Sequence, residues 1–250
     1  MAMSGDYLDV YSGYRSHDNY KELFPSIFKL LSSEVNLGSV KSCLIVGPGD
    51  GVHEVMFINT CVPGTSRIIA LEPDHESAER FRARLESSLP VVARQVVETS
   101  IQGWKGPDYQ VDLVLMMLVL YYVSPSERKE LFKKLHEQWL AKDGRVVIVS
   151  SSRTKSPGNA NEIFARLGTP LLAWEDIEAD MLEAGFVKQF AREMQFTRDF
   201  TKLDQSFLRF YQYHIDQPVT LDDVRRVITE LFPDGQSDQL FYTMAVFHKE

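Results

Sequence analysis

The sequence has little of several features that mark special classes of protein. Only two of its 250 residues, Cys43 and Cys61, are cysteine, so we expect neither a disulfide framework nor a zinc site built from thiols. The net charge is -8 and no run of Lys or Arg exceeds two residues, which disfavours general binding to nucleic acid or anionic lipid. The longest apolar run, residues 113–123, is too short to span a bilayer, and the N-terminus lacks the pattern of a signal peptide. These absences predict a cytoplasmic protein that handles small ligands.

Apolar runs of strand length alternate with segments of helical period. The runs are residues 40–46, 67–71, 91–97, 111–118 and 145–149, and this alternation predicts a parallel sheet covered by helices. Asp74 is expected to cap one helix, and Ser124-Pro125 to open another that ends at Asp143-Gly144. A further helix is expected over residues 174–184, with Gly185 as its stop.

The two ends of the chain depart from simple alternation. Residues 186–196 and 240–248 are expected to form two antiparallel strands, and residues 204–215 and 221–232 to form helices. Residues 20–31 are expected to form two short helices that meet at Pro25 and can lie over a ligand. The fold class is therefore α/β, with a doubly wound, seven-stranded, mostly parallel sheet, an antiparallel C-terminal hairpin and an N-terminal helical cover.

Three glycines, Gly47, Gly49 and Gly51, follow the first expected strand and precede a helix. Ligands meet a doubly wound sheet at this kind of turn, where glycine allows a close backbone approach. A dinucleotide fingerprint would have its third glycine at the position of Val52, and a phosphate-binding loop would end in Gly-Lys-Ser/Thr. The spacing favours a ligand without a pyrophosphate, with an NAD enzyme of shortened loop as the alternative.

Glu72 ends the second expected strand. A carboxylate at this place can accept hydrogen bonds from both hydroxyls of a ribose, so the pair of loop and acid indicates an adenosyl sulfonium as the ligand. Taken singly, the glycines are equally compatible with a plain tight turn, and Glu72 with a solvated strand end.

These features resemble those of the class I S-adenosylmethionine-dependent methyltransferases, over residues 40–250. Within that class, the segments 44–51, 71–73, 98–100, 112–123 and 174–185 are similar to the histamine N-methyltransferases. The narrower signals are Glu98-Thr99-Ser100 and Leu120-Tyr121-Tyr122-Val123. The resemblance implies one methyltransferase domain over residues 1–250, in which residues 1–39 are a helical cover, 40–150 the cofactor-binding core and 151–250 the substrate-side helices and final strands.

The resemblance also implies roles for single residues. S-adenosylmethionine would be bound by Gly47, Gly49, Gly51, Glu72, Ser100 and Met117. Tyr121 and Tyr122 would wall the site of the methyl acceptor, and Asp18 would bind a protonated amine. The rest of the substrate pocket would include Phe24, Leu118, Phe164 and Tyr242. The expected substrate is a small amine, histamine-like or another biogenic amine. Leu118 and Tyr242 stand where the family has glutamine and asparagine, and this loss of polar groups favours a larger or more apolar amine over histamine itself.

Several alternatives stay open on the sequence alone. Tyr121 and Tyr122 could pack in the core on opposite faces of a strand, and Asp18 could cap a helix. The reaction could be O- or carboxyl-methylation, because a fold does not choose the nucleophile. A methyltransferase-like binding protein would be indicated by an exposed apolar face on the helices of residues 204–232. The histidine spacing indicates no metal site, and we expect a monomer without nucleic-acid or membrane partners.

Overall fold

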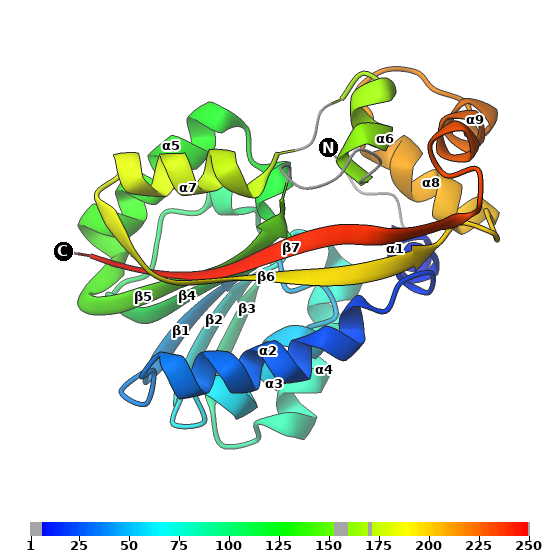
Figure 1. Ribbon diagram of the computed structural model, residues 1–250. Coiled ribbons are helices and arrows are strands. Elements are labelled where there is room, and N and C mark those ends of the chain that lie inside the picture. Colours follow the sequence, from blue (N-terminus) through cyan, green and yellow to red (C-terminus); the bar gives the residue numbers. More distant parts are fainter. Residues whose placement is uncertain (1–6, 153–159, 170–171, 250) are drawn as a thin grey trace. The chain divides into compact units, whose positions relative to one another are not determined.

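The computed structural model describes residues 7–152, 160–169 and 172–249, and its strands form one sheet in the order β3-β2-β1-β4-β5-β7-β6 (Figure 1). The strands are β1 Ser42–Val46, β2 Arg67–Leu71, β3 Ala93–Val97, β4 Val111–Met117, β5 Leu140–Ser151, β6 Phe186–Asp199 and β7 Gln236–Lys249. β1 pairs in parallel with β2 and β4, and β4 in parallel with β5. The C-terminal strands β6 and β7 complete the sheet as an antiparallel pair. The predicted fold class is confirmed.

Nine helices lie in the described part of the chain. They are α1 Tyr7–Arg15, α2 Tyr20–Glu34, α3 Val52–Cys61, α4 His75–Ser88, α5 Pro125–Lys134, α6 Ala160–Arg166, α7 Trp174–Glu183, α8 Gln205–Tyr213 and α9 Leu221–Leu231. Four of them, α4, α5, α8 and α9, begin at a side-chain cap. The Asp74 side chain accepts a hydrogen bond from the Ser77 N–H at 2.8 Å, and Ser124 forms a capping box with Glu127. Both predicted helix starts are confirmed. No helix in the described part of the chain combines the length and apolar character that a membrane span requires.

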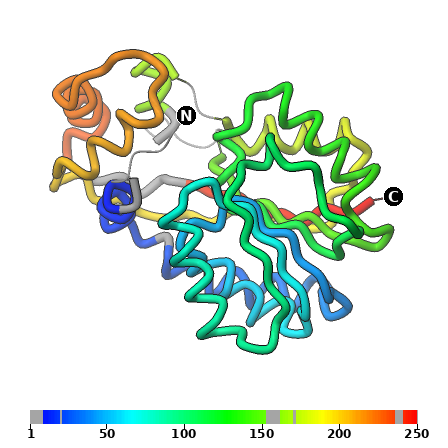
Figure 2. The backbone as a smooth tube through the Cα atoms, turned by 180° about the vertical axis from the view of Figure 1, so that it is seen from behind, coloured from blue at the N-terminus to red at the C-terminus, as the bar shows by residue number. Residues whose placement is uncertain are grey.

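The chain divides into two compact units. Unit 1 comprises residues 1–23, 151–174 and 193–242, and unit 2 comprises residues 24–150, 175–192 and 243–250. In unit 2, α2, α3 and α4 cover one face of the sheet and α5 and α7 cover the other (Figure 1), as the view from behind also shows (Figure 2). Strands covered on both faces are apolar along their length, and β1 is buried at every position. The boundaries predicted at residues 39 and 150 stay a prediction.

Unit 1 has its own aromatic core, formed largely by α1, α6, α8 and α9. Phe164, Phe207 and Tyr211 are each at most 1% exposed in this cluster. The apolar residues of α8 and α9, from Phe207 to Ile228, point into it. Within the described residues, α8 and α9 therefore present no large apolar face to solvent. Such an exposed face would have indicated a methyltransferase-like binding protein.

α2 is one continuous helix, so the prediction of two short helices meeting at Pro25 is wrong. A proline inside a helix removes one hydrogen bond and crowds the carbonyl four residues earlier, at a cost of about 3 kcal/mol. The apolar residues that follow it, Ile27, Phe28 and Leu31, are buried. Burying each such side chain contributes about 1.5–3 kcal/mol, which outweighs the proline penalty. The preceding helix α1 was not predicted.

The helix that starts at Ser124 ends earlier than predicted. It passes through a π-helical turn, η3 Leu135–Trp139, and β5 begins at Leu140. Asp143 and Gly144 therefore lie inside a strand and do not end a helix. The β4–β5 pairing is irregular there, because Val111 pairs with Leu140 whereas Leu113 pairs with Arg145. The irregular segment contains Asp143 and Gly144, which are typical turn residues. The sequence pattern therefore predicted a helix end at this place.

Candidate active site

The glycine loop lies at the point where the strand order reverses. β2 and β3 extend the sheet on one side of β1, and β4 and β5 on the other, which is where open α/β sheets bind ligands. Gly47, Gly49 and Gly51 follow β1 with φ of +59°, +57° and +73°. These values lie in the left-handed region, which glycine adopts without a steric penalty. The predicted loop is thus built on three left-handed residues.

The three glycines differ in what surrounds them. A Cβ atom on Gly47 would lie 2.4 Å from Cγ2 of Val119, and one on Gly51 would lie 1.9 Å from Cδ2 of Phe81. A Cβ atom on Gly49 would meet no atom within 4 Å. Packing therefore requires glycine at two positions, whereas Gly49 borders open space from which a ligand can reach the backbone.

Glu72 is joined to this loop by hydrogen bonds. It follows β2, is 5% exposed, and accepts from the Gly49 N–H at 2.9 Å and from the Asp74 N–H at 3.0 Å. Burial raises the pKa of Glu72, and the two backbone hydrogen bonds oppose that rise. Each carboxylate oxygen has a second lone pair. The structure thus brings Glu72 to Gly49 with acceptor capacity to spare.

A second buried acid lies beside the loop. Glu54, in the first turn of α3, is 6% exposed, and burial together with the nearby Asp50 and Glu72 raises its pKa to about 8. Glu54 is therefore mostly neutral at pH 7. Sequence reasoning missed it, although an acid three residues after the last glycine, among apolar neighbours, was a visible signal.

Ser100 and Met117 lie at the ends of β3 and β4. Ser100 is half-buried and precedes the 3₁₀ turn η1 Ile101–Gly103, and Met117 is buried as the last residue of β4. Both therefore stand at the carboxyl edge of the parallel sheet, the edge to which the glycine loop also belongs.

The two tyrosines follow β4 on a turn. Tyr121 and Tyr122 belong to the 3₁₀ turn η2 Leu120–Tyr122, with ring centroids 4.4 Å apart, and Tyr122 is 44% exposed. The idea that they point to opposite faces of a strand is wrong, because the strand ends at Met117. Both rings instead stand together after the end of β4.

Leu118 links β4 to that turn in a strained conformation. Its φ is +55°, the one positive value found for a non-glycine residue in the described part of the chain. For an L-residue the left-handed region costs about 1–2 kcal/mol. The Leu118 N–H donates to the Val149 carbonyl at 2.9 Å, which holds the turn, and the next residue, Val119, packs on Gly47. Strain of this kind concentrates at functional sites.

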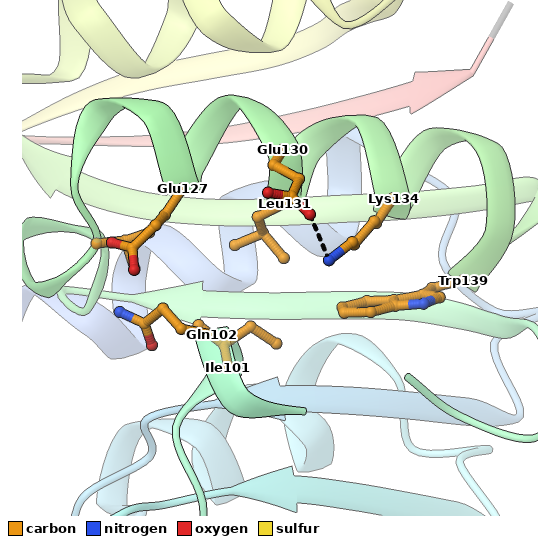
Figure 3. Close-up of a pocket in the computed structure, with 8 residues that line it drawn as sticks. Ile101, Gln102, Glu127, Glu130, Leu131, Lys134 and Trp139 are labelled. Atoms are coloured by element: carbon orange, nitrogen blue, oxygen red, sulfur yellow. Dashed lines mark ion pairs between the residues drawn. The ribbon is translucent and has the colours of Figure 1, made fainter. Parts of the chain in front are cut away.

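A small cavity of about 190 Å³ lies between η1 and α5 (Figure 3). Its apolar lining is Ile101, Val123, Leu131 and Trp139, and its polar lining is Gln102, Glu127, Glu130 and Lys134. The Lys134 ammonium pairs with Glu130 at 2.7 Å above the Trp139 ring. The lining includes none of the predicted site residues, but Ile101 follows Ser100, and Gln102 Nε2 donates to the Tyr122 carbonyl at 3.2 Å. The cavity thus borders both turns of the candidate site.

Asp18 lies in unit 1, where its backbone forms a bridge with Arg198 of β6. Its side chain is fully buried, and Oδ2 accepts from Arg198 Nη2 at 2.7 Å and from Arg15 Nη1 at 3.2 Å. Arg15 Nη1 also donates to the Tyr242 hydroxyl at 2.9 Å. Two guanidinium groups therefore hold the Asp18 carboxylate, and the structure gives no support to a helix-cap role.

Phe24 and Phe164 are core residues of different units. Phe24 is 1% exposed and stacks on His53 with centroids 4.3 Å apart in unit 2. Phe164 is equally buried and packs on Tyr211 at 4.9 Å in unit 1. Their role in a substrate pocket stays a prediction.

One group of side chains could hold a metal ion. A ligand atom of each of His75, Glu79 and Glu98 lies within 4.8 Å of the others, and all three residues are exposed. Glu98 already bonds to His75 at 2.9 Å and to Arg82 at 2.9 Å, and Arg82 also contacts Glu79. Because these partners satisfy the carboxylates, we assign no metal to the cluster. The spacing of the histidines did not indicate this cluster, because Glu98 is remote from His75 in sequence.

Comparisons with known proteins identify the domain. A family model described as "Methyltransferase domain" matches residues 43–144, which contain the glycine loop, Glu72 and both tyrosines. Residues 43–144 form a methyltransferase domain that uses S-adenosylmethionine. None of the curated protein sequences matches the chain.

Solved structures of the methyltransferase fold resemble the chain over most of its length. A protein of Galdieria sulphuraria assigned as a sarcosine dimethylglycine methyltransferase shares 14% identity, with 92% of this chain and 85% of that chain covered and a TM-score of 0.57. The N-methyltransferase NodS of Bradyrhizobium japonicum, in complex with S-adenosyl-L-homocysteine, shares 16% identity, with 92% and 86% covered and a TM-score of 0.55. The [4+2]-cyclase SpnF shares 12% identity, with 90% and 81% covered and a TM-score of 0.58. At these identities the likeness shows the fold alone, and a cyclase among the three illustrates that fold does not fix the reaction.

Proposed function

We propose that this methyltransferase transfers the methyl group of S-adenosylmethionine to a nitrogen of a small amine. The proposal has a donor half, the binding of S-adenosylmethionine, and an acceptor half, the binding of the amine. The donor half is supported by the Glu72 carboxylate, which accepts a hydrogen bond from the Gly49 N–H beside open space. An acceptor group next to an unobstructed backbone suits a ribose whose hydroxyls donate to the acid.

The residues present fit this cofactor. Gly47, Gly49 and Gly51 would border its methionine part, Glu72 would bind the ribose, and Ser100 and Met117 would lie beside the adenosine. When bound, the cofactor supplies an activated methyl group on a sulfonium, so the chain has mainly to position the two reactants and exclude water.

The acceptor half rests on the turn after β4. Tyr121 and Tyr122 would wall the acceptor, and an aromatic face stabilises a cationic ammonium by about 0.5–2 kcal/mol. The attacking nitrogen has to be unprotonated. Phe24 and Leu118 are proposed as further substrate contacts from unit 2, and Asp18, Phe164 and Tyr242 as candidate substrate contacts from unit 1. The apolar Leu118 and the phenol of Tyr242, at positions where the resembled family has amides, favour a biogenic amine other than histamine.

The donor half is tested by Glu72→Ala. Two hydrogen bonds to one carboxylate would be lost, about 1.5–3 kcal/mol each before water replaces them, so we expect the affinity for S-adenosylmethionine to fall at least 10-fold in calorimetry. Glu98→Ala, which removes an exposed acid at the end of the next strand, serves as the matched control and should bind normally. Unchanged affinity in a folded Glu72→Ala variant would remove Glu72 from the site.

The acceptor half is tested by a product screen. The purified protein and methyl donor are incubated with biogenic amines, imidazoles, amino acids and phenols, and products are identified by mass. We expect methylated amines. Products from phenols or carboxylic acids alone would replace N-methylation by O- or carboxyl-methylation, and no product from any class would favour a non-catalytic binding protein.

A further inference from the structure

The neighbouring strands β1 and β4 are each followed by a residue with left-handed backbone. The strands run in register, with Val46 paired to Met116. Gly47, directly after β1, has a φ of +59°, and Leu118, directly after β4, has a φ of +55°. The Leu118 N–H still donates to the Val149 carbonyl of β5 at 2.9 Å. The left-handed region is unfavourable for leucine, so surrounding contacts have to impose this conformation.

The turn at Leu118 places the next side chain, Val119, against the backbone of Gly47. A Cβ atom on Gly47 would lie 2.4 Å from Cγ2 of Val119 and 3.2 Å from its Cβ, so only glycine leaves room for this valine. Gly47 is the first residue of the glycine loop, which is proposed to bind the methyl donor. The half-buried Val119 side chain therefore packs directly on the proposed donor site.

The backbone of Val119 belongs to the turn that carries the two tyrosines. The Tyr122 N–H donates to the Val119 carbonyl at 3.1 Å, which closes the turn around Tyr121. At the far end of the turn, the Tyr122 carbonyl accepts from Gln102 Nε2 at 3.2 Å. One residue thus contacts the glycine loop through its side chain and the tyrosine turn through its backbone.

A ligand that fixes Gly47 would also restrict Val119 and the turn that Val119 begins. Close-packed groups of this kind change between discrete arrangements rather than deforming continuously. We propose that Val119 is a positioning residue that couples the glycine loop to the Tyr121–Tyr122 turn, so that binding of the methyl donor orders this wall of the acceptor site. The inference rests on the proposed function, which puts the donor at the loop and the acceptor at the tyrosines.

Hydrogen exchange of the full wild-type chain, with and without saturating S-adenosyl-L-homocysteine, tests the coupling. This ligand is the donor without its transferable methyl group, so the measurement needs no acceptor. We expect the amides of residues 118–123 to exchange about 5-fold or more slowly with the ligand, which is the lower end of typical coupling between two sites. Unchanged exchange in a chain that binds the ligand overturns the proposal.

Three variants separate coupling through Val119 from direct contact between the ligand and the turn. Val119→Ala removes the methyl group that packs on Gly47, so we expect the ligand-dependent slowing to disappear. Val119→Thr keeps the β-branched shape and should restore it. Val114→Ala makes the same truncation where β4 pairs with Leu44, and should behave like the wild type. Slowing that persists in Val119→Ala, or that Val114→Ala also abolishes, overturns the assignment to Val119.

Gln102→Ala keeps the proposal testable if Val119→Ala does not fold. Gln102 is exposed, and its truncation releases only the far end of the tyrosine turn. Ligand binding then has to order a looser turn, so we expect the calorimetric affinity for S-adenosyl-L-homocysteine to fall about 5-fold. An affinity equal to that of the wild type overturns the coupling.

Failure of the coupling is distinguishable from failure of the proposed function. A chain that binds S-adenosyl-L-homocysteine without slower exchange in the turn refutes only the coupling. A chain that does not bind this ligand refutes the donor site, and the coupling with it. Slower exchange in a chain that methylates only phenols or carboxylic acids supports the coupling and refutes N-methylation.

Discussion

The glycine loop of unit 2 and the arginine–aspartate cluster of unit 1, formed by Arg15, Asp18 and Arg198, are built in opposite ways. The loop and its acid lie within residues 47–74, and backbone N–H groups make the contacts that join Glu72 to Gly49 and Asp74. The cluster is held together by hydrogen bonds between side chains. Arg15 donates to Tyr242 and Arg198 donates to Asp18, so each of these two bonds joins residues more than 100 positions apart in sequence. Backbone contacts survive many substitutions, whereas a side-chain cluster depends on every member.

This difference has a consequence for function. At the loop, a residue that contacts a ligand can be separated from residues that only support the fold, since Gly49 borders open space and Gly51 does not. In the cluster, the same side chains bond to one another and compensate one another's charge. A substitution at the loop can therefore leave stability largely unchanged, whereas a substitution in the cluster also changes stability.

The largest effects are expected within the loop, where variants of Gly49 and Gly51 test whether ligand binding and stability can be separated. Gly51→Val would place a branched side chain against Phe81 at a φ of +73°, and we expect a loss of roughly 2–5 kcal/mol of folding free energy. Gly49→Val should lose only about 1–2 kcal/mol, from its backbone conformation, yet weaken S-adenosylmethionine binding about 100-fold by filling the open space. Urea unfolding and calorimetry on both variants measure the two effects. Equal losses of stability would contradict the distinction.

In the cluster, Asp18→Asn should destabilise the protein even without ligand. Removing one partner of a buried ion pair costs about 3–5 kcal/mol, because the remaining charges are left uncompensated. Glu34→Gln, which breaks the exposed pair with Arg192, is the control and should change stability by less than about 1 kcal/mol. Urea unfolding of both variants provides the measurement. A silent Asp18→Asn would restore the helix-cap interpretation, because asparagine caps a helix as well as aspartate does.

The buried acid beside the loop adds a pH dependence to unit 2. The pKa of Glu54 is raised from an ordinary 4.5 to about 8 in the folded protein, so between these values the folded chain holds a proton that the unfolded chain has released. The stability due to this group is full below pH 4.5 and is lost as the pH rises through 8. Glu54→Gln should therefore gain about 2–4 kcal/mol relative to the wild type between pH 5 and pH 8.5. Glu98→Gln should show no such gain, and parallel stability curves for Glu54→Gln and the wild type would contradict the raised pKa.

The smallest expected effect concerns the turn after β4. Asparagine tolerates the left-handed conformation better than other non-glycine residues, so Leu118→Asn should be about 0.5–1 kcal/mol more stable than Leu118→Ala. Thermal melting of the two variants measures this difference. A Leu118→Ala that is the more stable of the two would show that the backbone at Leu118 carries no strain.

Much of the fold, and the position of Glu72 beside the glycine loop, was predictable because the signals are local. Continuous apolar runs predicted the central strands, Asp74 and Ser124 predicted helix starts, and the Gly47–Gly51 spacing with Glu72 predicted the ligand edge of the sheet. Each signal acts over a few residues, through backbone conformation or hydrogen bonds to the nearest turn. The errors at Pro25 and Asp143-Gly144 arose where packing and strand pairing overrode such local preferences.

The sequence by itself determined the sheet, its switch point and a glycine loop paired with an acid, because these follow from periodicity and from residues with special backbone preferences. Only the tertiary structure decided that Asp18 lies between two arginines, that Glu54 is buried beside Glu72, and that Gly49 alone among the three loop glycines borders open space. The physical reason is that burial, charge and hydrogen-bond satisfaction depend on neighbours brought together by long-range folding. No pattern along the chain reports how many guanidinium groups share one carboxylate.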